Sequence, residues 1–123
     1  MTPSEAKTAP SRTDAEVALT RLQEMSAELR GAAILDASGE PLVATGPVER
    51  WAEPARGLLA AADEAAGEPV SQVHVGTEDG EAFAVRQDGL AAVVVAERFN
   101  LSSLMTFDMR SVLRDLALQG SAG

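Results

Sequence analysis

The 123-residue sequence contains no cysteine and no tyrosine, one tryptophan and three phenylalanines. Without cysteine there can be no disulfide bond, zinc–thiolate centre or thiol nucleophile. Aromatic residues make up only 3% of the chain, and aromatic side chains are common in the walls of small-molecule pockets. The composition therefore excludes thiol chemistry and disfavours a ligand-sensing role.

Long hydrophobic runs and lysine are also scarce. The longest purely apolar run, Leu90–Ala96, is far too short to cross a bilayer, and the first residues lack the pattern of a secretory signal. We therefore expect a soluble, cytoplasmic protein without direct membrane insertion. The only lysine is Lys7 and no G-x-x-x-x-G-K-S/T phosphate-binding loop occurs, so the chain is not itself a P-loop nucleotide hydrolase.

Acidic residues outnumber basic ones, which gives a formal net charge of −9. Such a chain repels phosphate backbones, so we do not expect a nucleic acid as partner. Its length fits one domain with a hydrophobic core of its own. The polar segments 1–12 and 119–123 are predicted to be disordered tails that flank a single domain over residues 13–118.

Hydrophobic periodicity predicts three helices and five strands. The helices are expected at 14–30, 49–66 and 101–118, and the strands at 32–36, 42–45, 70–75, around Phe83 and Val85, and at 90–97. The resulting order, α-β-β-α-β-β-β-α, predicts an α/β (α+β) fold. Its five-stranded sheet should be largely antiparallel, with helices on both faces.

Local signals suggest where several elements begin and end. Thr13 and Glu16 have the spacing of a capping box, and Gly31 stands where a left-handed cap would end the first helix. Pro41 cannot donate to a strand ladder, which predicts that the second strand lies at an edge of the sheet. The valine run at 93–95 is typical of a central strand that is covered on both faces.

Residues that could carry chemistry are few. His74 is the only histidine and no G-x-S-x-G motif accompanies it, so a surface or interface position is favoured over catalysis. The neighbouring Asp63 and Glu64 do not share a helix face and are predicted to be solvated rather than an acid–base pair. We therefore expect no catalytic, cofactor-binding or metal-binding residues, and a protein that is not an enzyme.

Trp51 and several arginines are candidates for contacts with a partner. A single tryptophan near the start of the second helix suits either a core anchor, which is favoured, or a binding hot spot. Arg50 and Arg56 on that helix could pair with acidic surfaces of a partner. Arg110 and Arg114 on the last helix could do so too, because they are one turn apart on the same face.

Several phrases of the sequence resemble the roadblock/LC7 family when they are taken together in order. They are a hairpin that begins Gly31-Ala-Ala-Ile-Leu-Asp-Ala-Ser-Gly-Glu, an Ala/Leu-rich middle helix, strands such as Val73-His-Val-Gly and Ala91-Ala-Val-Val-Val, and a last helix that opens Asn100-Leu. The resemblance covers residues 14–118. It extends to bacterial polarity regulators that act on Ras-like small GTPases.

The resemblance implies a homodimer in which the third strand pairs with its own copy and the second helices lie against each other. The residues that it places at or near the dimer contact are Leu58, Leu59, Ala62, Val70, Val73, His74 and Val75. The sequence supports part of this, because the third strand lacks the charged side chains that usually protect an exposed sheet edge.

The function implied is non-catalytic regulation or scaffolding of a Ras-like small GTPase through state-selective binding, with Trp51, Arg50 and Arg56 as candidate partner contacts and no cofactor. Two alternatives remain open. One is a pure assembly module without effect on nucleotide turnover, and the other is a small-molecule sensor of the PAS or profilin-like type.

Overall fold

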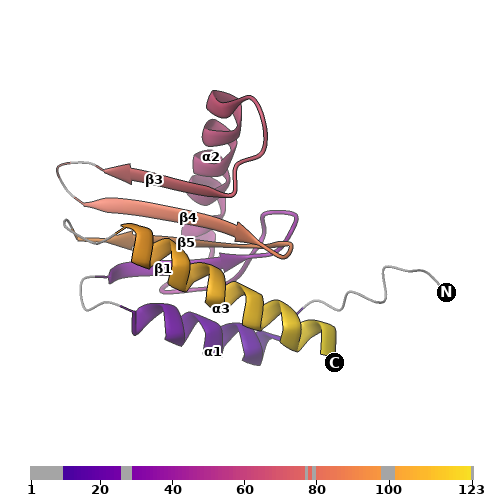
Figure 1. Ribbon diagram of the computed structural model, residues 1–123. Coiled ribbons are helices and arrows are strands. Elements are labelled where there is room, and N and C mark those ends of the chain that lie inside the picture. Colours follow the sequence, from indigo (N-terminus) through magenta and orange to yellow (C-terminus); the bar gives the residue numbers. More distant parts are fainter. Residues whose placement is uncertain (1–9, 26–28, 77, 79, 98–101, 123) are drawn as a thin grey trace.

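The computed structural model describes residues 10–25, 29–76, 78, 80–97 and 102–122, with only the backbone at 102–104 and 120–122. The chain forms three layers, in which α2 covers one face of a five-stranded sheet and α1 and α3 lie side by side on the other (Figure 1). The helices are α1 (Arg12–Gln23), α2 (Glu49–Ala66) and α3 (Ser102–Ala122); the strands are β1 (Leu29–Leu35), β2 (Pro41–Ala44), β3 (Gln72–Gly76), β4 (Glu81–Gln87) and β5 (Leu90–Ala96).

The sheet has the strand order β2-β1-β5-β4-β3, and every neighbouring pair is antiparallel. The element order and the antiparallel sheet confirm the predicted fold class. The valine-rich β5 lies at the centre and is buried along most of its length. β2, which begins with Pro41, forms one edge as expected, and β3 forms the other.

The predicted boundary between the first helix and the first strand is wrong. α1 ends at Gln23, and Gly31 lies within β1 rather than in a helix cap. Glycine is required there for another reason, because a Cβ atom at this position would stand 2.9 Å from the Trp51 ring. The expected capping box is also absent: Ser11 is the N-cap residue, and its hydroxyl accepts a hydrogen bond from the backbone N–H of Asp14.

The second helix agrees with its prediction at both ends. Pro54 lies inside the helix, as its sixth residue, where proline cannot supply the N–H that would bond to the carbonyl of Arg50. Gly67 ends it in the left-handed conformation, at φ 77°, which glycine adopts without strain. The strand that follows begins at Gln72, so Val70 lies in the connection and not in the strand.

The remaining boundaries differ by a few residues. β1 and β2 begin earlier than predicted, β5 ends at Ala96 rather than at residue 97, and α3 continues to Ala122, past the predicted end at 118. The expected N-cap, Asn100, and residues 1–9 of the tail predicted over 1–12 lie outside the described residues. Among the described helices, none combines the length and apolarity that a membrane crossing requires.

The apolar interior is divided by the sheet into two clusters. The larger one lies between the sheet and the α1–α3 pair and includes the fully buried Leu22, Phe83, Met109 and Leu113. The smaller one lies under α2 and consists of Leu35, Ala55, Leu59, Ala84, Ala91 and Val93. The α1–α3 side is therefore the main core of the protein, and Met105 and Met109 lie within it.

Candidate interaction site at the β3 edge and α2

The edge strand β3 has a hydrogen-bonded neighbour, β4, on one side only. Its side chains alternate between the faces of the sheet, as in any strand. Val73 packs against the cluster under α2, and Val75, on the same face, remains 40% exposed. The outer edge of β3 thus has backbone N–H and C=O groups without a neighbouring strand, and the exposed Val75 lies beside them.

His74 points to the opposite face of β3 and is held by two neighbours. Its ring stacks on Phe83, with centroids 4.5 Å apart and an interplanar angle of 5°. Its Nε2 lies 2.6 Å from a carboxylate oxygen of Glu81. Both partners belong to β4, so His74 joins the edge strand to the sheet and has the surface position that the sequence predicts.

The C-terminal end of α2 is fastened to the sheet by Arg86 of β4. Its guanidinium donates to both carboxylate oxygens of Asp63, at 2.8 and 3.0 Å, and to the carbonyl oxygen of Val70, at 3.0 Å. Asp63 also accepts from the backbone N–H of Val70, at 2.9 Å. The hydrogen bonds from Arg86 lower the pKa of Asp63, and the same contact raises the pKa of Arg86. We refer to Asp63, Val70 and Arg86 as the Arg86 bracket.

The middle of α2 lies over the sheet, and its last turns project beyond β3 (Figure 1). Leu59 is buried, whereas Leu58 and Ala62 are half-buried. Residues 64–66, of which two are alanine, are exposed. α2 therefore presents a partly apolar surface next to the open edge of the sheet.

The N-terminal end of α2 is anchored by Trp51. Its indole N–H donates to the carbonyl oxygen of Thr45, at 3.0 Å, and the ring is half-buried against the cluster under α2. This geometry agrees with the favoured interpretation of Trp51 as a core anchor. Nearby, Arg50 is exposed, and Arg56 forms an ion pair of 3.0 Å with Glu40.

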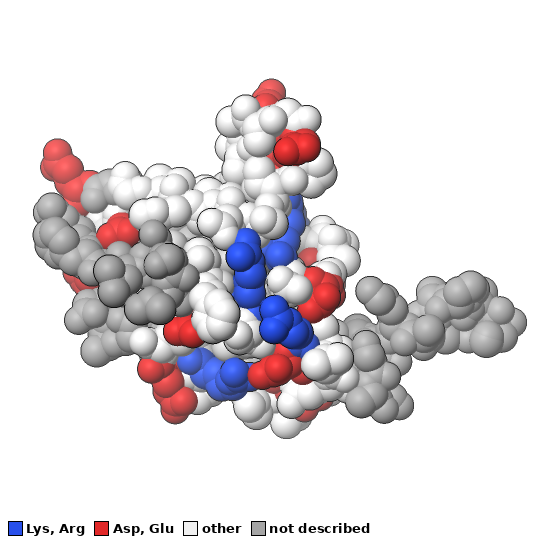
Figure 2. All heavy atoms as spheres, in the orientation of Figure 1, with Lys and Arg blue, Asp and Glu red and all other residues white. Residues whose placement is uncertain are grey.

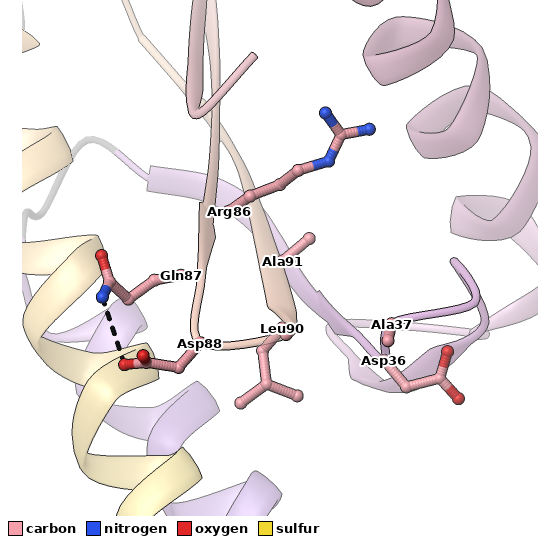
Figure 3. Close-up of a pocket in the computed structure, with 8 residues that line it drawn as sticks. Asp36, Ala37, Arg86, Gln87, Asp88, Leu90 and Ala91 are labelled. Carbon is pink, nitrogen blue, oxygen red and sulfur yellow. Dashed lines mark hydrogen bonds between the residues drawn. The ribbon is translucent and has the colours of Figure 1, made fainter. Parts of the chain in front are cut away.

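A shallow hollow lies between the β1–β2 and β4–β5 turns (Figure 3). Its polar side chains point in different directions: Arg86 extends towards α2, while Gln87 donates to Asp88, at 3.1 Å, on another side. Within the residues that the structure describes, no three histidine, aspartate or glutamate side chains come together as metal ligands would.

Comparisons with proteins of known structure identify the fold. The sequence matches no protein-family model and no curated protein. A roadblock/LC7 domain from Streptomyces avermitilis, however, superposes with a TM-score of 0.68 at 19% identity, over 80% of this chain and 91% of that one. The chain has the roadblock/LC7 fold.

Two further structures with the roadblock/LC7 fold match nearly end to end. The gliding protein MglB from Thermus thermophilus has a TM-score of 0.72 at 15% identity, over 100% of both chains. An MglB with a tetrameric arrangement has a TM-score of 0.69 at 17% identity, over 99% of this chain and 98% of that one. The resemblance seen in the sequence is thus confirmed at the level of the fold.

In this roadblock/LC7 fold the residues expected at a dimer contact form two groups. Val73, His74 and Val75 lie on β3, and Leu58, Leu59 and Ala62 lie on α2, while Val70 lies in the connection between these two elements. The expected partner contacts Arg50, Trp51 and Arg56 are near the other end of α2.

Sequence reasoning missed the Arg86 bracket. It treated Asp63 as a solvated surface residue, but the structure shows a doubly hydrogen-bonded ion pair with Arg86. The two residues are 23 positions apart and no local pattern links them. That Asp63 of α2 faces Arg86 of β4 can be deduced only once the order of the strands in the sheet is known.

Proposed function

We propose that this protein is a non-catalytic homodimer that regulates or scaffolds a Ras-like small GTPase. Two copies would pair through β3, which would continue the sheet from one subunit into the other, and their α2 helices would pack across the junction. The roadblock/LC7 fold and the tetrameric arrangement of an MglB of the same fold support self-association. Resemblance to polarity regulators supports a GTPase as partner.

The observation that carries the dimer is the combination of an edge strand with an exposed apolar corner beside it. Val75 is 40% exposed, and its register partner Ala82 and the adjacent Val95 of β5 are half-buried. A strand edge without charged side chains is prone to pair with another strand. Pairing of two β3 strands would satisfy their backbone groups and allow the second α2 to cover this corner.

The dimer is tested by a matched pair of variants, Val75→Glu and Val17→Glu. Val17 of α1 is also exposed, at 53%, but lies on the other face of the sheet. We expect a wild-type dimer in sedimentation velocity at about 20 µM, a monomer for Val75→Glu and a dimer for Val17→Glu. A wild-type monomer at about 500 µM, or a dimer for both variants, would refute the proposal.

The mechanism proposed for the GTPase is selection of one nucleotide state. A dimer that binds one conformation of the switch regions more tightly shifts the GTPase towards that conformation without supplying a reactive group. The N-terminal part of α2, where Arg50 and Arg56 stand, is the proposed contact. Its exposed basic side chains suit an acidic patch on the partner.

This part is tested with Ras-like GTPases encoded beside the gene, each loaded with GDP or a non-hydrolysable GTP analogue. We expect the affinities for the two states to differ at least tenfold. Arg50→Glu/Arg56→Glu should weaken the tighter complex at least tenfold, whereas Arg12→Glu on α1 should not. Equal affinity for both states, with unchanged hydrolysis and exchange rates, would instead indicate a pure assembly module.

A further inference from the structure

The outer side of α3 carries a stripe that none of the contacts described above uses. It consists of Phe107, Arg110, Arg114 and Leu118, whose spacing of three to four residues places them on one side of a helix. Phe107 and Leu118 are 66% and 61% exposed, more than any other large hydrophobic residue in the described part of the chain. Arg114 is exposed and Arg110 is half-buried. We call these four residues the α3 stripe.

The arginines of the α3 stripe are not neutralised by carboxylates. Arg110 donates to the uncharged side chains of Gln72 and Ser71, and within the described residues no ion pair of Arg114 occurs. Asp115 is engaged by Arg21 of α1, at 2.9 Å. Figure 2 shows several basic side chains on this face of the molecule, with acidic ones beside them. Arg110 and Arg114 thus form a basic stretch of α3 on a chain whose net charge is −9.

Asp108 does not change this balance, because its position in the helix turns it away from the stripe. Residues two apart on a helix point to different sides, and Asp108 precedes Arg110 by two. It is half-buried. The α3 stripe thus presents two positive charges between two apolar side chains, over a length of about 16 Å at about 1.5 Å per residue.

We propose that the α3 stripe is a docking site for an acidic, amphipathic segment of a partner protein. Carboxylates of that segment would pair with Arg110 and Arg114, and its apolar side chains would contact Phe107 and Leu118. Charge complementarity disfavours two other occupants. A second α3 would bring arginines against arginines, and segment 1–9 carries one acidic and one basic side chain.

The site is on the face of the sheet opposite α2. It is therefore separate from the contact proposed for the GTPase, but it adjoins the edge strand proposed for the dimer, because Arg110 donates to Gln72 of β3. A dimer would carry two such sites. Arginine pairs planar carboxylates through two parallel hydrogen bonds, and an aromatic side chain beside it provides an anchor of the kind that dominates binding energy at interfaces.

The test is selection from a displayed library of random peptides, about 12 residues long, against the full-length chain. We expect the enriched peptides to combine Asp or Glu with Leu, Ile or Phe. For the best synthetic peptide, Arg114→Glu and Phe107→Ser should each weaken binding at least tenfold in fluorescence anisotropy. Raising the salt concentration from about 50 to about 300 mM should weaken wild-type binding about threefold or more, since exposed charge pairs are screened.

The matched control is Arg12→Glu, which makes the same charge change at an exposed position of α1. It should retain wild-type affinity within twofold. The proposal is overturned if no peptides are enriched, if the enriched peptides are not acidic, or if their binding is equally insensitive to Arg114→Glu and Arg12→Glu. Binding of the wild type, but not of Phe107→Ser, to vesicles with about 30% phosphatidylglycerol would assign the stripe to a membrane and also overturn it. Circular dichroism of each variant separates lost binding from lost folding.

Discussion

The two faces of the sheet are covered in different ways. On one face, α1 and α3 together bury a large apolar cluster that includes Met105 and Met109. Under α2 a single helix runs across the sheet, and a smaller cluster leaves Val75 exposed and Val95 half-buried. The first face resembles the interior of a finished domain, and the second resembles one half of an interface.

This difference separates stability from association. Burial of apolar surface is the main source of folding free energy, so most of it comes from the α1–α3 side. The α2 side contributes less to folding but has exposed apolar and unpaired backbone groups, which favour contact with another chain. Substitutions on the α1–α3 side should therefore mainly reduce folding stability, whereas those at the exposed residues of the α2 side should mainly reduce association with another chain.

A leucine-to-alanine substitution on each face of the sheet tests how much the two clusters contribute to stability. Leu113→Ala, in α3, removes a side chain that is fully buried in the larger cluster. It should lower the free energy of unfolding by about 3–4 kcal/mol, because the lost transfer free energy and an unrelaxed cavity add together. Leu59→Ala, at 6% exposure in the smaller cluster, should cost about 2 kcal/mol. Urea denaturation measures both, and equal losses would contradict the comparison.

Gly31→Ala tests how tightly the N-terminal end of α2 is seated. The new Cβ would stand 2.9 Å from Cζ2 of Trp51 and 3.0 Å from the hydroxyl oxygen of Thr45. Such overpacking should destabilise the protein by about 1–3 kcal/mol. Gly57→Ala is the control, because nothing lies within 4 Å of its added Cβ; it should stabilise α2 by about 0.5–1 kcal/mol. In the Trp51→Leu background the cost of Gly31→Ala should largely disappear.

The Arg86 bracket should leave a signature in acid. The pKa of Asp63 is lowered in the folded protein by its hydrogen bonds from Arg86, so its contribution to stability is complete above the ordinary aspartate value of about 4 and is lost as the pH falls through the lower folded value. Asp63→Asn should therefore melt at a lower temperature than wild type at about pH 6, with a smaller further drop at about pH 3. Thermal melts across this range check the prediction.

The prediction is contradicted if the difference in melting temperature between wild type and Asp63→Asn is the same at about pH 6 and at about pH 3. Some acid sensitivity should persist in the variant, since the pKa of Glu97 is also lowered by a hydrogen bond from Arg30. Arg86→Gln should also lower the melting temperature at about pH 6, and the double variant should lose less stability than the sum of the two single losses, because both remove the Asp63–Arg86 ion pair.

The smallest effect is expected for the exposed ion pair between Arg56 and Glu40. Its members are 44% and 65% exposed, and solvent-exposed pairs contribute about 0–1 kcal/mol. Arg56→Gln should therefore change the free energy of unfolding by less than about 1 kcal/mol. If Arg56 contacts a GTPase, the same variant should nevertheless weaken that complex, which separates a binding role from a structural one.

Much of the fold could be predicted because its elements carry clear local signals. Gly67 ends α2 where the sequence indicates, and the edge position of Pro41 and the central position of residues 93–95 follow from backbone chemistry and hydrophobicity. The boundary between α1 and β1 could not be predicted in this way. Met25 and Leu29 continue the helical spacing, yet both pack against the main core from beyond the end of α1.

The candidate site was predictable only in outline. The exposed edge strand was implied by the resemblance to the roadblock/LC7 family, but the contacts of His74 with Phe83 and Glu81 depend on the strand register. The exposure of Phe107, at 66%, is apparent only in the structure.

The Arg86 bracket has a consequence for how motion could spread through the molecule. One guanidinium joins the last part of α2 to Val70, in the connection that precedes the edge strand. A partner that drew the Asp63 carboxylate towards itself would break these contacts at both places, and in the proposed dimer this would weaken the pairing of the two β3 strands.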